Sequence, residues 1–356
     1  MKINCFMRIG LMLLIVFSCA NDKTPIKNKY KKRSPMADYF LMEGNKFLKK
    51  HDFKRALALA DSAELYAIKK DDVYFFKGRI YSELGRFSKA DQAYNYTINI
   101  NPDYIGAWNN LGNNAFRQQN FSQAVEYYKK EIIKNKTSIP FRALGRAYVE
   151  LGKTDSARIC FQHSIDINNN YASAYLNLAQ LEEDEGSLNK ALQLASRAYA
   201  LEPNNVEYQY VYSTILVQMD RGKEAIYSLR EIIKEWPWHH GAHYNLGRAL
   251  IQSGQKVEGQ QYLDESEKIR ANQAKIDHLE NTIRALPDDP YSYAALAFAL
   301  RKVGRFNDSM HSYKVALYLD PDNYDIWNNV ANLYLLQKDT IKALDCLLYT
   351  SDAADE

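Results

Sequence analysis

The feature that most constrains this 356-residue sequence is a small residue that returns about every 34 positions. A second small residue precedes it by twelve positions, so every unit carries two short side chains in constant phase. A missing or short side chain lets two helices approach closely, so the pattern predicts a packed helix pair in each unit. The leading small residues are Gly44, Gly78, Gly112, Gly145, Ala179, Ser213, Gly247, Ala297 and Ala331, and their partners are Ala56, Ala90, Ala124, Ala157, Ala191, Ala225, Gly259, Ser309 and Ala343.

The residues around these positions have helical spacing. Large side chains lie four positions before and three positions after the leading small residue, as Tyr74 and Tyr81 do around Gly78. This spacing places them on one helix face. Seven positions after the leading residue, five units carry a glycine, which predicts a left-handed end of the first helix. Prolines such as Pro102 and Pro203 then stop second helices, because proline cannot continue a helix.

The clearest copy of the unit spans residues 105–138. It has Trp108, Leu111, Gly112, Phe121, Ala124 and Tyr128 at the places typical of the tetratricopeptide repeat (TPR), and the sequence resembles that family over residues 37–345. The resemblance implies an all-α fold, a TPR α-solenoid in which about eight helix-turn-helix repeats and a truncated ninth form a right-handed superhelix. It also implies that first helices line the concave face and second helices the convex face.

One step in the series is 50 residues instead of 34, between Gly259 and Ser309. The 16 extra residues continue an apolar pattern at helical spacing, with Ile276 and Ile283 in it. We therefore expect a lengthened second helix or an extra helix, and not a loop. The predicted divisions are TPR repeats 1–7 over residues 37–273, a helical insert over 274–289, and repeat 8 with a partial repeat 9 over 290–345.

The beginning of the chain predicts export. A basic start and an apolar run form a signal peptide over residues 1–18, which is too short to span a bilayer. The segment that ends at Cys19 resembles a bacterial lipobox, which implies lipidation of Cys19; a plain signal peptide or a short N-terminal anchor are the alternatives. Residues 19–36 predict a basic flexible tether, or a segment that lies on anionic lipid headgroups. The expected location is the bacterial cell envelope, lipid-anchored at the outer membrane and facing the periplasm.

The last eleven residues, Cys346 to Glu356, match the translation of a transposase sequencing adapter. We therefore expect residues 346–356 to be a non-native tail, and the natural chain to continue differently after Asp345. The acidic residues of this tail and Cys346 are accordingly left out of the functional interpretation.

Composition and motifs favour binding over catalysis. Lys and Arg number 46 against 43 Asp and Glu, a balance that argues against a dedicated nucleic-acid binder. The sequence carries no motif of a zinc protease, a serine hydrolase, a P-loop or a dinucleotide site. His239, His240 and His243 form a metal-like cluster, but we interpret them as packing and turn residues, and Cys160 as a small buried hydrophobe. We expect no catalytic residue, cofactor or metal.

The family's ligand-binding positions identify a candidate groove. In TPR domains that hold a peptide's terminal carboxylate, ligand-facing side chains lie three and two positions before the small residue and one after it. Arg79, Asn110, Arg142 and Arg146 resemble such a clamp, although Phe75 stands where the family has Lys. Arg grips carboxylates in paired hydrogen bonds, and Asn pairs with peptide backbone. A less specific peptide groove and a hydrated groove without a single ligand are the alternatives. The candidate residues are Asn45, Arg79, Asn109, Asn110, Asn113, Arg142, Arg146, Asn177, Gln180, Asn245 and Arg248.

These features together predict a membrane-tethered, non-catalytic TPR scaffold that binds peptides or partner proteins in its concave groove. The alternative is the substrate-recognition arm of a larger enzyme, such as a glycosyltransferase-like protein, whose catalytic domain lies beyond residue 345. Asn110, Asn177, Asn245 and Asn329 resemble part of the asparagine ladder in the TPR arm of O-linked N-acetylglucosamine transferase. Homo-oligomerisation through an exposed terminal repeat is a third hypothesis.

Overall fold

The computed structural model describes residues 34–352, and the 18 elements in this range are all α-helices. Each repeat contributes two antiparallel helices, and the repeats begin where the 34-residue pattern predicts them. The first helices are α2 (Pro35–Lys49), α4 (Asp71–Glu83), α6 (Ala107–Arg117), α8 (Ser138–Glu150), α10 (Ala172–Asp184), α12 (Val206–Gln218), α14 (His240–Gln252), α16 (Pro290–Lys302) and α18 (Tyr324–Leu336). The second helices are α3 (Phe53–Tyr66), α5 (Phe87–Ile100), α7 (Phe121–Lys134), α9 (Thr154–Ile167), α11 (Leu188–Leu201), α13 (Gly222–Glu235), α15 (Lys256–Ala285), α17 (Phe306–Leu319) and α19 (Thr340–Asp352).

The leading glycines make room for an aromatic ring of the second helix. A Cβ atom on Gly112 would lie 2.5 Å from the ring of Tyr128, a separation too short for a real contact. Gly145 stands in the same relation to Phe161. In the α14–α15 pair the partner is backbone instead, since a Cβ on Gly247 would lie 2.8 Å from the carbonyl oxygen of Gly259. The leading glycines thus admit a ring of the second helix in three repeats, a ring of α4 beside Gly44, and a neighbouring backbone beside Gly247.

The turn inside every repeat contains one residue with a positive φ, always seven positions after the leading small residue. The predicted glycines Gly85, Gly152, Gly186, Gly254 and Gly304 have φ values between 67° and 89°. In the other four repeats a residue with a side chain takes this left-handed conformation: His51, Gln119, Asp220 and Lys338, with φ between 55° and 62°. A residue with a side chain is strained in the left-handed conformation, so these four turns cost more conformational energy than the glycine turns.

The predicted insert is a continuous lengthening of one second helix. Helix α15 is 30 residues long, so of the two alternatives the lengthened helix is confirmed. Its first half packs on α14, where Ser266 Oγ donates to the His240 carbonyl at 3.0 Å. Its second half packs on α16, with Ile276 buried beside Leu296 and Leu300. At 1.5 Å per residue, 16 extra residues displace the following repeats by about 24 Å along the helix.

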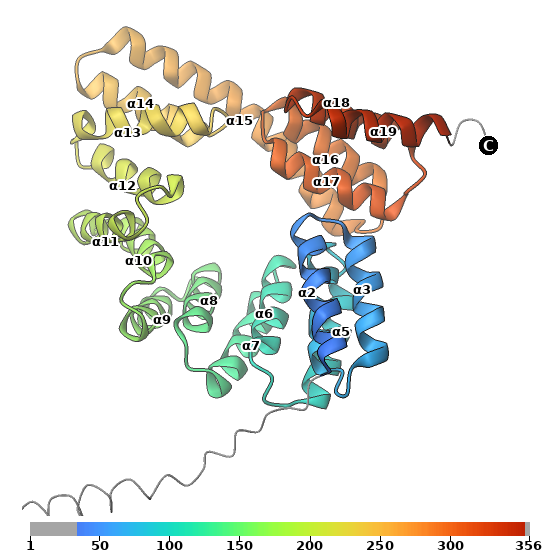
Figure 1. The fold of residues 1–356 in the computed structure, drawn as a ribbon. Helices are drawn as coiled ribbons and strands as arrows, with labels where there is room; N and C mark the ends of the chain where they lie inside the picture. Colours follow the sequence, from blue (N-terminus) through green and yellow to red (C-terminus); the bar gives the residue numbers. More distant parts are fainter. Residues whose placement is uncertain (1–33, 353–356) are drawn as a thin grey trace, which may run out of the picture.

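The solenoid closes on itself. Figure 1 shows the helices winding from α2 through α14 in an arc, with α15 crossing back so that α16 and α17 return to the first repeats. Helix α17 contacts α3, and one hydrophobic cluster contains Phe53 and Ile80 from the first two repeats together with Tyr293 and Tyr313 from the eighth. The two ends of the repeat array therefore share a core, which the sequence analysis did not predict.

The ends of the chain differ in part from the sequence-based divisions. Residues 1–33, with the predicted signal peptide, Cys19 and most of the tether, lie outside the described residues. Helix α2 begins inside the predicted tether, because Pro35 occupies its first turn and Ser34 Oγ accepts from the Ala37 amide at 3.4 Å. The ninth repeat has both helices, and the second continues seven residues into the predicted non-native tail. No described helix is long and apolar enough to cross a membrane.

The strained turns make a test of the fold. A Cβ atom on Gly152 would meet nothing within 4 Å, so Gly152→Ala changes only backbone strain. We expect it to lower the free energy of unfolding by about 1 kcal/mol. The matched change Gln119→Gly, at the same position of the previous repeat, should raise it by a similar amount. Urea unfolding followed by circular dichroism measures both, and equal midpoints for the two variants would contradict this account of the turn.

Candidate functional site

The closed arrangement encloses a central cavity of about 1930 Å³. One wall comes from the α4–α5 turn and from α6 and α8, and the opposite wall from the second half of α15 with α16 and α17. Small-molecule sites usually measure about 300–1,000 Å³, so this volume suits a polypeptide segment better. First helices line the concave side as expected, but the second helices α15 and α17 also line it, because they close the ring across from α6 and α8.

The structure brings five of the eleven predicted groove residues to this cavity. Asn109, Asn110 and Asn113 line it from α6, and Arg142 and Arg146 line it from α8. They belong to consecutive repeats, so the wall that they form is continuous. The predicted groove is therefore concentrated in one part of the solenoid, and does not follow its whole concave face.

A buried carboxylate positions the asparagine-rich helix. Glu131 of α7 is 1% exposed, and its carboxylate accepts from the backbone amides of Gly106 at 2.8 Å and Asn109 at 3.2 Å. These amides are at the beginning of α6, where the helix dipole favours a negative charge. Asn113 in turn accepts from the Tyr128 hydroxyl at 2.9 Å. Asn109 Oδ1 is buried and accepts no hydrogen bond from the described part of the chain.

Three arginines on this wall have only neutral partners among the described residues: Arg117, Arg142 and Arg146. Arg142 donates to the Tyr171 hydroxyl at 2.8 Å and to Asn177 Oδ1 at 3.3 Å. The Arg146 guanidinium lies 4.9 Å from the ring centroid of Phe116. The direct partners of Arg142 and Arg146 are neutral, and the carboxylates on this wall, Glu83 and Glu150, form no ion pair with the three arginines in the described part of the chain, so the guanidinium groups can bind an anion.

Ion pairs lie across the cavity and on its opposite wall. Arg86 of the α4–α5 turn binds Asp288 at 3.0 Å across the cavity, and Arg305 binds Asp308 at 2.7 Å on the opposite wall. Glu280 of α15 faces the cavity without an ion pair in the described structure, and burial raises the pKa of its carboxyl group. Arg284 of the same helix also faces the cavity, with Asn281 as its hydrogen-bond partner and no ion pair in the described structure, so this wall carries charges of both signs.

The other predicted residues lie outside this cavity. Arg79 donates to Asn45 Oδ1 at 2.9 Å, so these two predicted groove residues are hydrogen-bonded to each other. The Asn177 amide donates to Gln180 Oε1 at 3.3 Å, and Asn177 Oδ1 accepts a hydrogen bond from Arg142. Asn245 does not face a groove: it is 5% exposed and donates to Thr214 Oγ1 at 2.9 Å, because it ties α14 to α12. The Arg248 guanidinium lies over the Tyr244 ring.

Some cavity residues were missed by the sequence analysis. Arg117, Glu83 and Glu150 line the cavity five positions after the leading small residue. A helical turn separates this position from the predicted one, so helical spacing was a signal that could have found them. Glu280 and Arg284 come from the insert, and no repeat position points to them.

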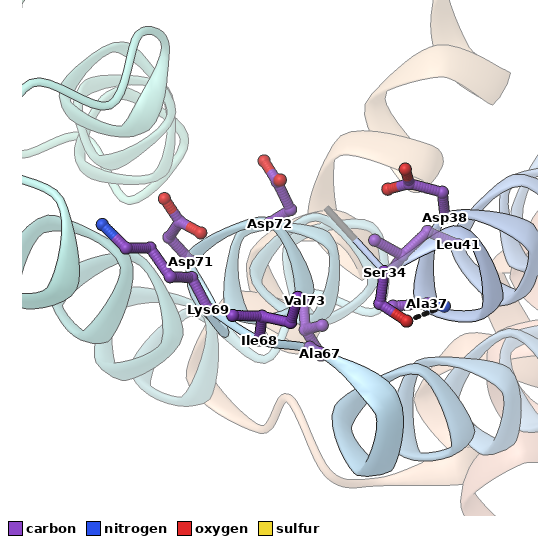
Figure 2. Close-up of a pocket in the computed structure, with 10 residues that line it drawn as sticks. All are labelled: Ser34, Ala37, Asp38, Leu41, Ala67, Ile68, Lys69, Asp71, Asp72 and Val73. Atoms are coloured by element: carbon purple, nitrogen blue, oxygen red, sulfur yellow. Dashed lines mark hydrogen bonds between the residues drawn. The ribbon is translucent and has the colours of Figure 1, made fainter. Parts of the chain in front are cut away.

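Two further features are structural. A second cavity of about 20 Å³ lies between α2 and α4 (Figure 2), lined by Ser34, Asp38 and Asp72 among others. It has room for one water molecule. The described residues contain no group of three or more His, Cys, Asp or Glu side chains placed to hold a metal ion. His239 accepts from the Ala242 amide at 3.1 Å and so caps α14. Cys160 is buried as predicted, and burial raises the pKa of its thiol to about 11.

Comparison with known proteins agrees with the repeat pattern. Family profiles described as tetratricopeptide repeat match residues 71–104, 105–130, 142–206 and 312–345. A profile described as anaphase-promoting complex, cyclosome, subunit 3 matches residues 184–266.

The proteins that are similar to this chain include human and bacterial ones. Human protein O-mannosyl-transferase TMTC3 is 22% identical over 341 residues, which are 84% of this chain and 37% of that protein. The chain spans between 20% and 37% of the length of the first curated relatives that it matches. The solved structure of Pseudomonas aeruginosa PilF has a TM-score of 0.51 at 16% identity, over 58% of this chain and 95% of that one. PilW, a type IV pilus biogenesis factor, has a TM-score of 0.52 at 15% identity, over 58% and 97%.

The profiles identify repeats at the positions of the helix pairs, and the solved structures share the solenoid fold. Members of this family bind peptides or other proteins. The chain belongs to the tetratricopeptide repeat family.

Proposed function

We propose that this chain is a non-catalytic scaffold that holds an acidic peptide segment of a partner protein in its central cavity. The observation that carries the proposal is the row of Arg117, Arg142 and Arg146 on one cavity wall, whose partners among the described residues are neutral. A peptide carboxylate would supply the missing negative charge. The asparagines of α6 lie beside these arginines and can pair with the peptide backbone.

We further propose that Cys19 carries a lipid that anchors the scaffold to the bacterial envelope, at the outer membrane and facing the periplasm. The signal-peptide pattern and the lipobox-like segment support this anchor. Similarity to PilF, a type IV pilus assembly protein, is in keeping with a scaffold for envelope assembly. The preformed wall would lose little conformational entropy on binding, which favours affinity.

The double variant Arg142→Ala, Arg146→Ala tests the binding wall. Each charge-assisted hydrogen bond contributes about 1.5–3 kcal/mol, so we expect the Kd for Glu- and Asp-rich peptides to rise at least about tenfold. Fluorescence anisotropy with labelled peptides of that composition measures the change. The melting temperature should fall only slightly: Arg146 is exposed, and Arg142 loses its hydrogen bonds to Tyr171 and Asn177 but no ion pair in the described structure.

Arg248→Ala is the matched control for this experiment. Arg248 occupies a predicted groove position on α14 but lies outside the cavity walls. We expect its replacement to leave peptide affinity unchanged. An equal loss of affinity in the Arg248 variant, or none in the double variant, would remove the basis for a specific site on the α6–α8 wall.

Cys19→Ala tests the anchor. Without the thiol no lipid can be attached, so the variant should move from the membrane fraction to the soluble fraction after cell lysis. Immunoblots of both fractions follow the protein, and a known lipoprotein in the same cells controls for lysis. Persistence of the variant in the membrane fraction would contradict the lipid anchor.

A second candidate function is favoured by the similarity to O-mannosyl-transferases TMTC1 and TMTC3, of which the chain covers 20% and 37%. In this alternative the solenoid is the substrate-recognition arm of a longer glycosyltransferase. Long-read sequencing of the gene past the codon for Asp345 separates the two. A reading frame that ends after one more helix supports the scaffold, and a further folded domain supports the recognition arm.

A further inference from the structure

The seam that closes the ring is the contact of α3 with α17 together with the turn before α3. It consists of Lys50, His51, Phe53, His311, Lys314 and Tyr318. The Phe53 ring lies 6.0 Å from that of His311 and 6.4 Å from that of Tyr318, and it belongs to the hydrophobic cluster that the first two repeats share with the eighth. Successive helices of the solenoid pack along their length, whereas the seam joins a helix start to the middle of another. It is therefore the weakest link in the ring.

A pair of histidines lies at the centre of this seam. Nδ1 of His51 and Nδ1 of His311 are 3.0 Å apart, and the two rings meet edge to face. A hydrogen bond between two imidazole nitrogens needs one protonated and one bare nitrogen, so it accommodates a single proton. Both rings line the central cavity as well. The seam thus borders the proposed binding site.

The surroundings of the pair are positively charged. Lys314 of α17 lies against it and donates to the Lys50 carbonyl at 2.5 Å, and Arg117 of α6 adds a second cation. Glu83 of α4 and Asp308 of α17 are the anions that act on the two rings. Asp308 already binds Arg305, and Asp52 in the turn acts on Lys314. If the histidine pair gains a second proton, few nearby carboxylates are free to compensate the added positive charge.

We propose that the His51–His311 pair is a proton-sensitive latch that holds the ring closed and opens the central cavity when both imidazoles are protonated. Two protonated nitrogens cannot share a hydrogen bond, and two imidazolium ions beside Lys314 and Arg117 repel each other. The shared hydrophobic cluster around Phe53 and the Arg86–Asp288 ion pair are the contacts that then remain between the two ends. Opening separates α3 from α17 and turns the closed cavity into an accessible groove.

The direction of the pH effect follows from the pKa values. Burial, His51 and Arg117 lower the pKa of His311 to about 4, and burial and Lys314 lower the pKa of His51. A group whose pKa is lower in the closed state than in the open state destabilises the closed state as the pH falls below the open-state value of about 6.5. For His311 alone, the closure equilibrium should fall roughly 30-fold between pH 7.5 and pH 5. Protonation of His51 adds to this.

The latch gives the cavity a controlled entrance. A closed ring admits a chain end that threads through it, whereas an open ring also admits a segment in the middle of a partner chain. This consequence rests on the proposed binding function. The latch is measured without any ligand, so an experiment that disproves the latch can be distinguished from one that disproves the binding function.

Hydrogen–deuterium exchange of the full chain at pH 7.5 and pH 5 tests the latch, after correction for the intrinsic pH dependence of exchange. Amides of the α2–α3 turn and of α17 should lose protection by roughly 30-fold at pH 5, and those of α10 to α13 should not. Small-angle scattering should show a larger maximum dimension at pH 5. Unchanged protection of the seam in the unmodified protein would overturn the proposal.

The double variant His51→Asn, His311→Gln removes both titrating groups, and asparagine tolerates the left-handed conformation of residue 51. We expect its seam protection to be the same at both pH values. His163→Gln, on the exposed surface of α9, is the matched control and should respond as the unmodified protein does. Lys314→Gln provides an independent check, because removal of the neighbouring charge should shift opening to lower pH. A double variant that still opens at pH 5 would assign the response to other groups.

Discussion

An aromatic ring seated over a glycine is the contact on which the other features depend. In three consecutive repeats a ring of the second helix occupies the space that a side chain on the first helix would fill, with Tyr94, Tyr128 and Phe161 over Gly78, Gly112 and Gly145. The ring fixes both the distance and the rotation of the two helices. Because each pair has the same geometry, each stacks on its neighbour in the same way, and a curved array results.

Curvature alone does not close the array. The lengthened helix α15 displaces the last repeats by about 24 Å along its axis, and α17 then meets α3. The central cavity is a consequence of this displacement, since one of its walls is made of α15, α16 and α17. The insert therefore shapes the site although it contributes few charged groups to it.

The candidate site was predictable where it follows the repeat. Arg142 and Arg146 were found from their position relative to a small residue, because that relation specifies which helix face they occupy. Asn245 occupies the same repeat position as Asn110 but is buried, and its amide donates to Thr214 of the neighbouring repeat. Glu280 and Arg284 lie outside the repeat, so no periodic argument applied to them. The His51–His311 contact joins residues 260 positions apart, which a nearest-neighbour pattern does not describe.

The sequence by itself determined the helix pairs, their order and the five glycine turns, because these depend on contacts within one repeat or between adjacent repeats. It also specified that the insert is helical, since its apolar residues keep the helical period. Only the tertiary structure decided that the array closes, which arginines share one cavity, and which histidines meet. Those outcomes depend on small rotations summed over the whole array, together with one displacement along α15, and no local pattern records such a sum.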